Sequence, residues 1–277
     1  MALTTAAQAE PASNPVLPLE PPRPARLPDQ ITVQHGPAAL LGRFFLMADG
    51  AARERGILLS LASMDELMEV NRRNGATWKP LVSIFDPAVG GVTPETGLAI
   101  LGRNAQGEVV ATQGARFYDW DQSDLLQEAT SLRMYYADPA AAARPGERVL
   151  LTAPAAPRIS GRVVFSGAGW YRPDYRGRLL SAILPRISRA LAYTRWRTDY
   201  TISVIADAVI AGGMAQRSGY TNVEDSLELF NSPMGAYIRG KLVWMGREQL
   251  LADLAQFMSG FDTQVDAGVE HRRAQQA

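Results

Sequence analysis

The sequence predicts a mixed α/β (α+β) domain in which helices flank a central, largely antiparallel sheet. Two observations lead to this prediction. Short apolar stretches alternate along the chain with segments whose apolar residues recur every three or four positions, which are the patterns of strands and of amphipathic helices. Two of the short stretches are also joined by the loop Asn104-Ala-Gln-Gly107, which predicts an antiparallel hairpin. The chain has 277 residues and is 47% apolar, so it can bury a substantial core.

The first half of the chain predicts two helices and three strands. Residues 38–55 have apolar side chains at helical spacing. A second helix over residues 64–74 is predicted from Ser63, an N-cap residue, with Glu66 three positions later completing a capping box. The predicted strands are residues 57–62, 96–103 and 108–118.

The second half alternates in the same way. Its predicted helices are residues 123–136, 177–196, 209–218 and 247–258. Pro185 predicts a kink or a later start in the second of these, and Gly219 is expected to end the third. The predicted strands are residues 149–153, 161–168, 201–206, 226–230 and 241–245.

Three parts of the chain differ in composition. Residues 1–30 are rich in proline, which favours neither helix nor central strand, and are expected to form a disordered tail. A ligand for a proline-recognising domain is the alternative for this segment. Residues 31–265 are expected to form one domain, and residues 266–277 a polar C-terminal tail.

Charge and composition exclude several classes of function. The formal net charge is zero, which leaves no electrostatic argument for nucleic acid or a membrane as partner. There is no cysteine, and the histidines are His35 and His271, so neither thiol catalysis nor a metal centre is expected. No secretory signal or membrane-spanning run is recognisable, and we expect a cytoplasmic protein.

One segment carries the pattern of a binding site. An apolar strand over residues 163–171 leads into Arg172-Pro-Asp-Tyr-Arg-Gly-Arg178 and then into a helix. Such a corner directs backbone N–H groups toward one point at the positive end of the helix dipole and can bind phosphate. Gly177 would allow close approach of the anion, and Arg176 or Arg178 could add a charged contact. The alternative is an ordinary strand-to-helix connection with solvated arginines.

This corner resembles the pyrophosphate-binding motif of the GCN5-related N-acetyltransferase (GNAT) superfamily, Pro-x-Tyr-Arg-Gly-x-Gly-x-Gly/Ala. Pro173, Tyr175, Arg176 and Gly177 match it, as does the position of Arg178. Leu179 and Ser181 replace two small residues of the family pattern. Downstream, Ala211 and Gly219-Tyr220 match, whereas Ala208 and Ala215 replace the usual asparagine and tyrosine. The chain thus resembles a divergent GNAT member with a GNAT-like sheet.

The resemblance implies acetyl-CoA as co-substrate, without a metal, and transfer of its acetyl group to an amine by direct attack. The acceptor would be a small-molecule or peptide amine. Backbone groups of the strand would bind the pantetheine and those of the corner the pyrophosphate. The cofactor-binding residues so implied are Ala168, Gly169, Trp170, Tyr171, Arg176, Gly177, Arg178, Leu179, Leu180 and Ser181.

The sequence indicates the catalytic residues less closely than the cofactor-binding residues. Asp207, at the end of a predicted strand, is the candidate base, and Tyr171 and Tyr220 are candidate acids. Removal of the proton by water, without a dedicated base, is the alternative. A cluster of acidic residues could bind the acceptor or form a solvated turn; it consists of Asp119, Asp121, Asp124 and Glu128. The alternative function is a non-catalytic GNAT-like binding or interaction module.

Overall fold

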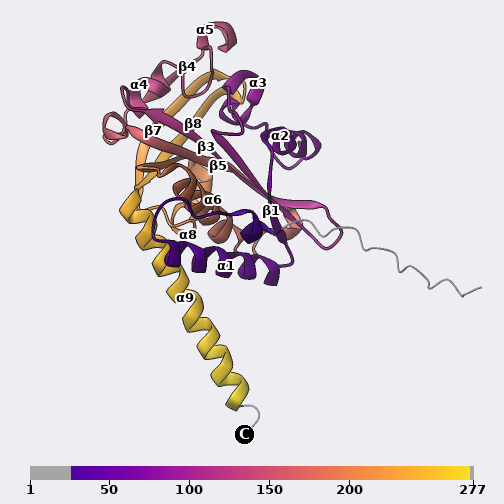
Figure 1. The fold of residues 1–277 in the computed structure, drawn as a ribbon. Coiled ribbons are helices and arrows are strands. Elements are labelled where there is room, and N and C mark those ends of the chain that lie inside the picture. The colour runs from indigo at the N-terminus through magenta and orange to yellow at the C-terminus, as the bar shows by residue number, and fades with distance from the viewer. Residues whose placement is uncertain (1–25, 275–277) are drawn as a thin grey trace, which may run out of the picture.

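The computed structural model describes residues 26–274, and for Ser226 and residues 261–274 it describes the backbone alone. Within this range eight strands form one sheet in the order β1-β2-β3-β5-β6-β8-β7-β4 (Figure 1). Strands β5 and β6 run parallel, and all other neighbours are antiparallel. The predicted mixed, largely antiparallel sheet is confirmed. The strands are β1 (Leu58–Ala62), β2 (Gly97–Arg103), β3 (Val109–Trp120), β4 (Arg148–Leu151), β5 (Gly161–Tyr171), β6 (Tyr200–Ala206), β7 (Asn222–Ser232) and β8 (Gly235–Gly246).

Helices cover both faces of the sheet (Figure 1). One face carries α1, α6 and α9, which also pack against one another. The other face carries α2, α3, α4 and the short 3-10 helix Ser83–Phe85. The α-helices are α1 (Ala38–Glu54), α2 (Met64–Arg73), α3 (Pro87–Gly90), α4 (Leu125–Thr130), α5 (Pro139–Ala142), α6 (Leu180–Trp196), α7 (Asp207–Ala211), α8 (Met214–Arg217) and α9 (Arg247–Ala274).

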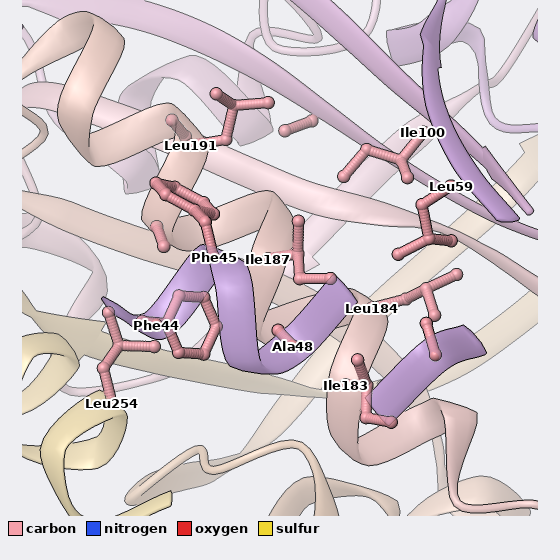
Figure 2. Packing of buried hydrophobic residues seen from close by; sticks show 14 of the residues in the cluster. Phe44, Phe45, Ala48, Leu59, Ile100, Ile183, Leu184, Ile187, Leu191 and Leu254 are labelled. Carbon is pink, nitrogen blue, oxygen red and sulfur yellow. The ribbon is translucent and has the colours of Figure 1, made fainter. Parts of the chain in front are cut away.

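The sheet is buried on both faces because successive side chains of a strand point in opposite directions. In β2, Leu98 and Ile100 join the core beneath α1 and α6, whereas Ala99 and Leu101 join the core on the other face. The α1–α6 core is formed by rings and branched aliphatic side chains at helical spacing. Figure 2 shows Phe44, Phe45 and Ala48 of α1 against Ile183, Leu184, Ile187 and Leu191 of α6, with Leu254 of α9.

Local signals in the sequence are realised at several positions. The Ser63 hydroxyl accepts a hydrogen bond from the Glu66 N–H at 3.1 Å, which is one half of the predicted capping box, whereas the Glu66 carboxylate accepts from Arg103 Nη2 at 2.5 Å. The β2–β3 hairpin turns where predicted, and the Asn104 side chain accepts from the N–H groups of Gln106 and Glu108. Helix α6 begins at Leu180 and continues through Pro185.

Two predicted helices differ from the structure. The helix over residues 123–136 is wrong beyond Thr130, where α4 ends. The hydroxyls of Thr130 and Ser131 bond to carbonyls one turn earlier, and Leu132 adopts a left-handed φ of 65°, which stops the helix. The helix over residues 209–218 is divided into α7 and α8 by Gly212 and Gly213.

The boundaries of the domain also differ. Leu27, in a 3-10 helix, is 1% exposed and belongs to the core, so the domain begins before residue 31. The expectation of a disordered tail concerns residues 1–25, which lie outside the described residues. Helix α9 continues to Ala274, well beyond the predicted end at residue 258.

Membrane-spanning helices and clusters of metal-ligating side chains are both absent from the part of the chain that the structure describes. Within residues 26–274, no helix has both the length and the hydropathy to cross a membrane. Within the same part of the chain, no group of three His, Cys, Asp or Glu side chains could hold a metal ion.

Candidate active site

The site lies where β5 and β6 separate. These parallel strands pair only at Val163↔Tyr200, Val164↔Thr201 and Phe165↔Ile202. Beyond these pairs, β5 continues to Tyr171 and β6 to Ala206 without further pairing between them. The backbone of residues 166–171 therefore presents an unpaired edge to the gap, and unpaired N–H and C=O groups are available for an extended ligand.

A β-bulge interrupts β5 beside this gap. Gly167 pairs with Gly114 and Trp170 with Thr112, so two residues, Ala168 and Gly169, lie opposite one residue of β3. Ala168 adopts a left-handed φ of 54°. The Thr112 hydroxyl donates to the Ala168 carbonyl at 2.8 Å and holds the bulge in place.

The predicted corner follows β5 and opens into α6. Gly177 has a φ of 77° and Leu179 one of 59°, both in the left-handed region. The N–H groups of Tyr175 and Arg176 bond back within the corner, and the next N–H to do so is that of Ala182, which donates to the Leu179 carbonyl at 2.9 Å. Between them, the N–H groups of residues 177–181 have no acceptor within the described residues. Free amides at the start of a helix such as the 17-residue α6 can bind an anion, and this role of the corner stays a prediction.

The arginines of the corner diverge. Arg176 Nε donates to the Tyr171 carbonyl at 3.1 Å, and the side chain lines the cavity above α6. Arg178 instead lies over the Tyr175 ring, 4.1 Å from its centroid, and donates to the Asp174 carbonyl. It does not line the cavity, which separates it from the other predicted cofactor-binding residues.

Two cavities meet at the bulge. The outer cavity, about 760 Å³, is bounded by the corner, by α8 and by the segment before residue 80. The inner cavity, about 310 Å³, lies between β5 and β6. Both are lined by Trp78, Lys79, Gly169, Val209 and Met214. They therefore form one continuous cleft from the α6 N-terminus into the sheet.

The predicted cofactor-binding residues divide between these cavities. The outer cavity is lined by Gly169, Trp170, Tyr171, Arg176, Gly177, Leu179, Leu180 and Ser181. The inner cavity is lined by Ala168 and again by Gly169. Nine of the ten thus border the cleft, and their roles toward acetyl-CoA stay predictions.

Sequence reasoning missed one wall of the cleft. Trp78 stacks on Trp170 with ring centroids 5.4 Å apart, and Lys79 follows it along the same wall. Arg217 of α8 also lines the outer cavity. Asn74-Gly75 signals a turn before Trp78 in the sequence, but a turn does not indicate which strand the segment contacts, and tertiary packing alone brings it to β5.

Tyr220 is the candidate acid that enters the inner cavity. Tyr220 is 7% exposed, and its hydroxyl makes no hydrogen bond of ordinary length and angle among the described residues, although the polar side chains of Arg189, Ser166 and Ser203 face it. Ser166 of β5 and Ser203 of β6 line the same cavity. Burial raises the pKa of the Tyr220 phenol, and the Arg189 guanidinium, 4.6 Å from the ring centroid, opposes that rise. The net rise in pKa keeps the phenol protonated at neutral pH.

The other predicted catalytic residues are placed differently. The Tyr171 hydroxyl donates to the Leu180 carbonyl at 3.5 Å, and burial raises its pKa. Asp207 is exposed, lies 3.7 Å from Arg239 Nε and lines neither cavity. The structure therefore brings Tyr220, but not Asp207, to the inner cavity.

The acidic cluster lies away from the cleft. In the sheet register, Asp119 of β3 lies opposite Arg162 of β5. Arg162 is near the start of β5, and the bulge is near the other end of that strand. Burial and the neighbouring Asp121 raise the pKa of Asp119, and Glu128 pairs with Arg133 at 2.8 Å. None of the four acidic residues lines the cleft, so the solvated-turn alternative describes this cluster better than acceptor binding.

Comparison with known proteins identifies structural similarity only. The sequence matches no protein-family model and no curated protein. The structure is similar to a mutant form of spermidine N-acetyltransferase SpeG from Vibrio cholerae, with a TM-score of 0.42, 10% identity and coverage of 71% of this chain and 96% of that chain. It is also similar to AAC(6')-Ib in complex with paromomycin and acetyl-CoA, with a TM-score of 0.39, 11% identity and coverage of 70% and 95%.

Proposed function

We propose that this chain is a divergent GNAT member that transfers an acetyl group from acetyl-CoA to an amine. The observation that carries the proposal is the continuity of the cleft. It joins an anion-binding corner at the start of α6 to a buried phenol, Tyr220, whose hydroxyl makes no hydrogen bond of ordinary length and angle among the described residues. A ligand that fills both ends needs an anionic head, an extended arm and a reactive tip, as acetyl-CoA has.

The residues present fit such a ligand. The free amides of residues 177–181 and the Arg176 guanidinium suit a diphosphate. The unpaired edge of β5 over residues 166–171 suits the two amide groups of pantetheine, which can bond to it as an added strand would. The bulge at Ala168 and Gly169 would then lie beside the thioester.

The chemistry requires a neutral amine and a leaving thiol. The amine nitrogen attacks the thioester carbonyl carbon, a C–N bond forms, and the C–S bond then breaks. The departing thiolate takes a proton from Tyr220, the amine gives its proton to solvent water, and a proton from solvent then restores the phenol. No carboxylate lines either cavity among the described residues, which favours water over a dedicated base. The products are an amide and free CoA thiol.

Binding and turnover can be tested separately. A ligand at about 100 times its Kd stabilises a protein by about 2.7 kcal/mol, so acetyl-CoA should raise the Tm measurably. Release of free thiol across an amine panel then reports turnover. The absence of any shift at millimolar acetyl-CoA would contradict the proposal. Binding without thiol release from any amine would instead support the non-catalytic alternative.

A further inference from the structure

We infer that the acceptor is an amine whose body is apolar, up to about the size of a phenyl ring, and that carries no second positive charge. This inference rests on the proposed N-acyltransferase function and names its substrate class. It comes from a third cavity and from the charges that line the whole cleft.

The third cavity, called here the apolar chamber, continues the cleft through the sheet. It measures about 190 Å³ and shares Val82, Phe165 and Met234 with the inner cavity. Its further walls include Ile84 and Ile238, and both pack with the core on the face of the sheet opposite α6. The chamber is therefore reached from the inner cavity and lies on the far side of the sheet from the anion-binding corner.

The position of the chamber assigns it to the acceptor. The acyl donor would enter from the corner and end beside the bulge, and an acetyl group adds only two carbon atoms beyond the sulfur. The amine must meet the thioester carbon from the side that the donor leaves open. The chamber opens on that side, so it receives the part of the acceptor attached to its amine.

The lining of the chamber selects an apolar body. Ile84 is fully buried and Leu229 is 7% exposed, whereas Arg239 at the other side of the chamber is exposed, so a ligand group packed against the apolar walls loses its contact with water on that side. An apolar cavity of about 150 Å³ accommodates benzene. A cavity of about 190 Å³ thus has room for a phenyl ring or a branched alkyl group.

The charged side chains that line the inner cavity and the chamber exclude an acceptor with several positive charges. Among the described residues, the charged side chains that line the inner cavity and the chamber are Lys79 and Arg239, both cationic. The nearby acid, Asp207, is 3.7 Å from Arg239 and lines neither space. A second ammonium group would be desolvated in apolar surroundings without a carboxylate to pair with, which costs several kcal/mol.

The test compares kcat/KM for phenethylamine, ethylamine and spermidine with acetyl-CoA, measured as thiol release. Burial of a phenyl group contributes about 1.5–3 kcal/mol, so phenethylamine should exceed ethylamine by about 10-fold or more. Spermidine should be the poorest acceptor per amine group. Equal rates for all three, or a preference for spermidine, would overturn the inference while leaving the proposed function standing.

Substitutions in the apolar chamber test whether this chamber determines the preference among amines. Ile238→Phe fills the chamber and should reduce kcat/KM for phenethylamine about 10-fold more than for ethylamine. Ile238→Ala enlarges the chamber and should shift the preference toward 2-naphthylmethylamine, which keeps the test valid if the larger side chain prevents folding. Val223→Phe, at an exposed β7 position that lines none of the three cavities, is the control and should change nothing.

Two outcomes separate the alternatives. If hexanoyl-CoA is a better donor than acetyl-CoA, and Ile238→Phe removes that advantage without changing amine preference, the chamber holds an acyl chain and the inference is overturned. If acetyl-CoA binds but no amine releases thiol, the proposed function fails, and the inference fails with it.

Discussion

Tyr220 lines the inner cavity although the GNAT pattern that the sequence resembles has its tyrosine at another position. That position holds Ala215, which is fully buried, and the Tyr220 N–H donates to the Ala215 carbonyl at 3.0 Å. Tyr220 thus follows directly from the end of α8 and lines the inner cavity, with its hydroxyl buried. The sequence named the residue as a candidate, but only packing distinguishes it from Tyr171.

Substitution of Tyr220 tests the proposed acid. Tyr220→Phe should lower kcat by about 10²-fold or more, the usual contribution of general acid catalysis, without changing the Kd of acetyl-CoA. Tyr171→Phe is the matched control, because the Tyr171 hydroxyl bonds to the Leu180 carbonyl. Steady-state kinetics and calorimetry of both variants provide the comparison. An equal loss of kcat in both variants would contradict the assignment of Tyr220, rather than Tyr171, as the acid.

The pH profile gives an independent test of the same phenol. Burial raises the pKa of Tyr220 above its usual value of about 10, so the proton to be donated is present throughout the neutral range. The amine nucleophile, in contrast, gains its reactive neutral form as pH rises. We expect kcat/KM to increase with pH and to show no falling limb below pH 10 (about the unperturbed phenol pKa). A fall in kcat/KM between about pH 7 and 9 would contradict this assignment.

Gly177 tests whether backbone amides bind the anion. Its φ is 77°, and a side chain there would meet nothing within 4 Å, so conformation rather than space is the constraint. Gly177→Val should weaken acetyl-CoA binding at least about 10-fold, because a β-branched residue resists this φ. Gly177→Asn should retain most of the affinity, since asparagine tolerates the left-handed region. Calorimetric titration of acetyl-CoA into both variants measures these affinities. Equal affinities would show that the corner does not bind the ligand.

Residues near the corner could be predicted because their pattern is local. Gly177, Leu180 and Ser181 follow one another along a strand-to-helix junction that the sequence shows directly. Lys79 and Trp78 could not be predicted, because they reach β5 only through packing of a segment about 90 residues earlier in the chain. The placement of Asp207 outside both cavities could not be predicted either, since being next to a strand in sequence does not determine which way a side chain points.

At the scale of elements, an ion pair holds α9 against α6. Arg186 donates two hydrogen bonds to Asp253, of 2.9 and 2.8 Å, and the two side chains are 8% and 11% exposed. Arg189 lies 3.5 Å from the same carboxylate. Because Arg189 also lies against Tyr220, this cluster connects the packing of α9 to the inner cavity.

Removal of the carboxylate should destabilise the domain. Asp253→Ala leaves two buried guanidinium groups without their partner, and we expect a loss of about 3–5 kcal/mol in the free energy of unfolding. Glu69→Ala is the control, because Glu69 pairs with the exposed Arg72 and Arg73 and should cost less than about 1 kcal/mol. Urea unfolding curves measure both. A loss below about 1 kcal/mol in Asp253→Ala would contradict this role.

The sequence predicts elements with a strong apolar periodicity well. It does not predict where an element ends when the backbone conformation or hydrogen bonds of a few residues end it. Helix α1 and strands β2 and β3 match their predicted ranges within two residues, because their apolar patterns agree with the final packing. The segment 123–136 has helical spacing too, but Leu132 has a left-handed backbone that no pattern predicts. Strands β7 and β8 extend beyond their apolar parts, because pairing within the long hairpin fixes their ends.

At the scale of the whole molecule, the separation of one parallel strand pair creates the cleft. The corner lies at the end of β5, the phenol comes from the segment after α8, and the apolar chamber belongs to the opposite face of the sheet. Helices α1, α6 and α9 lie together on one face of the sheet (Figure 1). The sheet thus separates a side suited to the acyl donor from a side suited to the acceptor.

Hydrogen exchange of backbone amides with and without acetyl-CoA tests this arrangement most directly. We predict added protection over residues 166–171, where β5 has an unpaired edge, and over residues 177–181, where the amides at the start of α6 have no acceptor among the described residues. Residues 119–124, at the other end of the β3–β5 pair, should show no change. Saturating acetyl-CoA that protected neither segment, or that protected a different part of the chain, would contradict the assignment of this cleft to acyl-CoA.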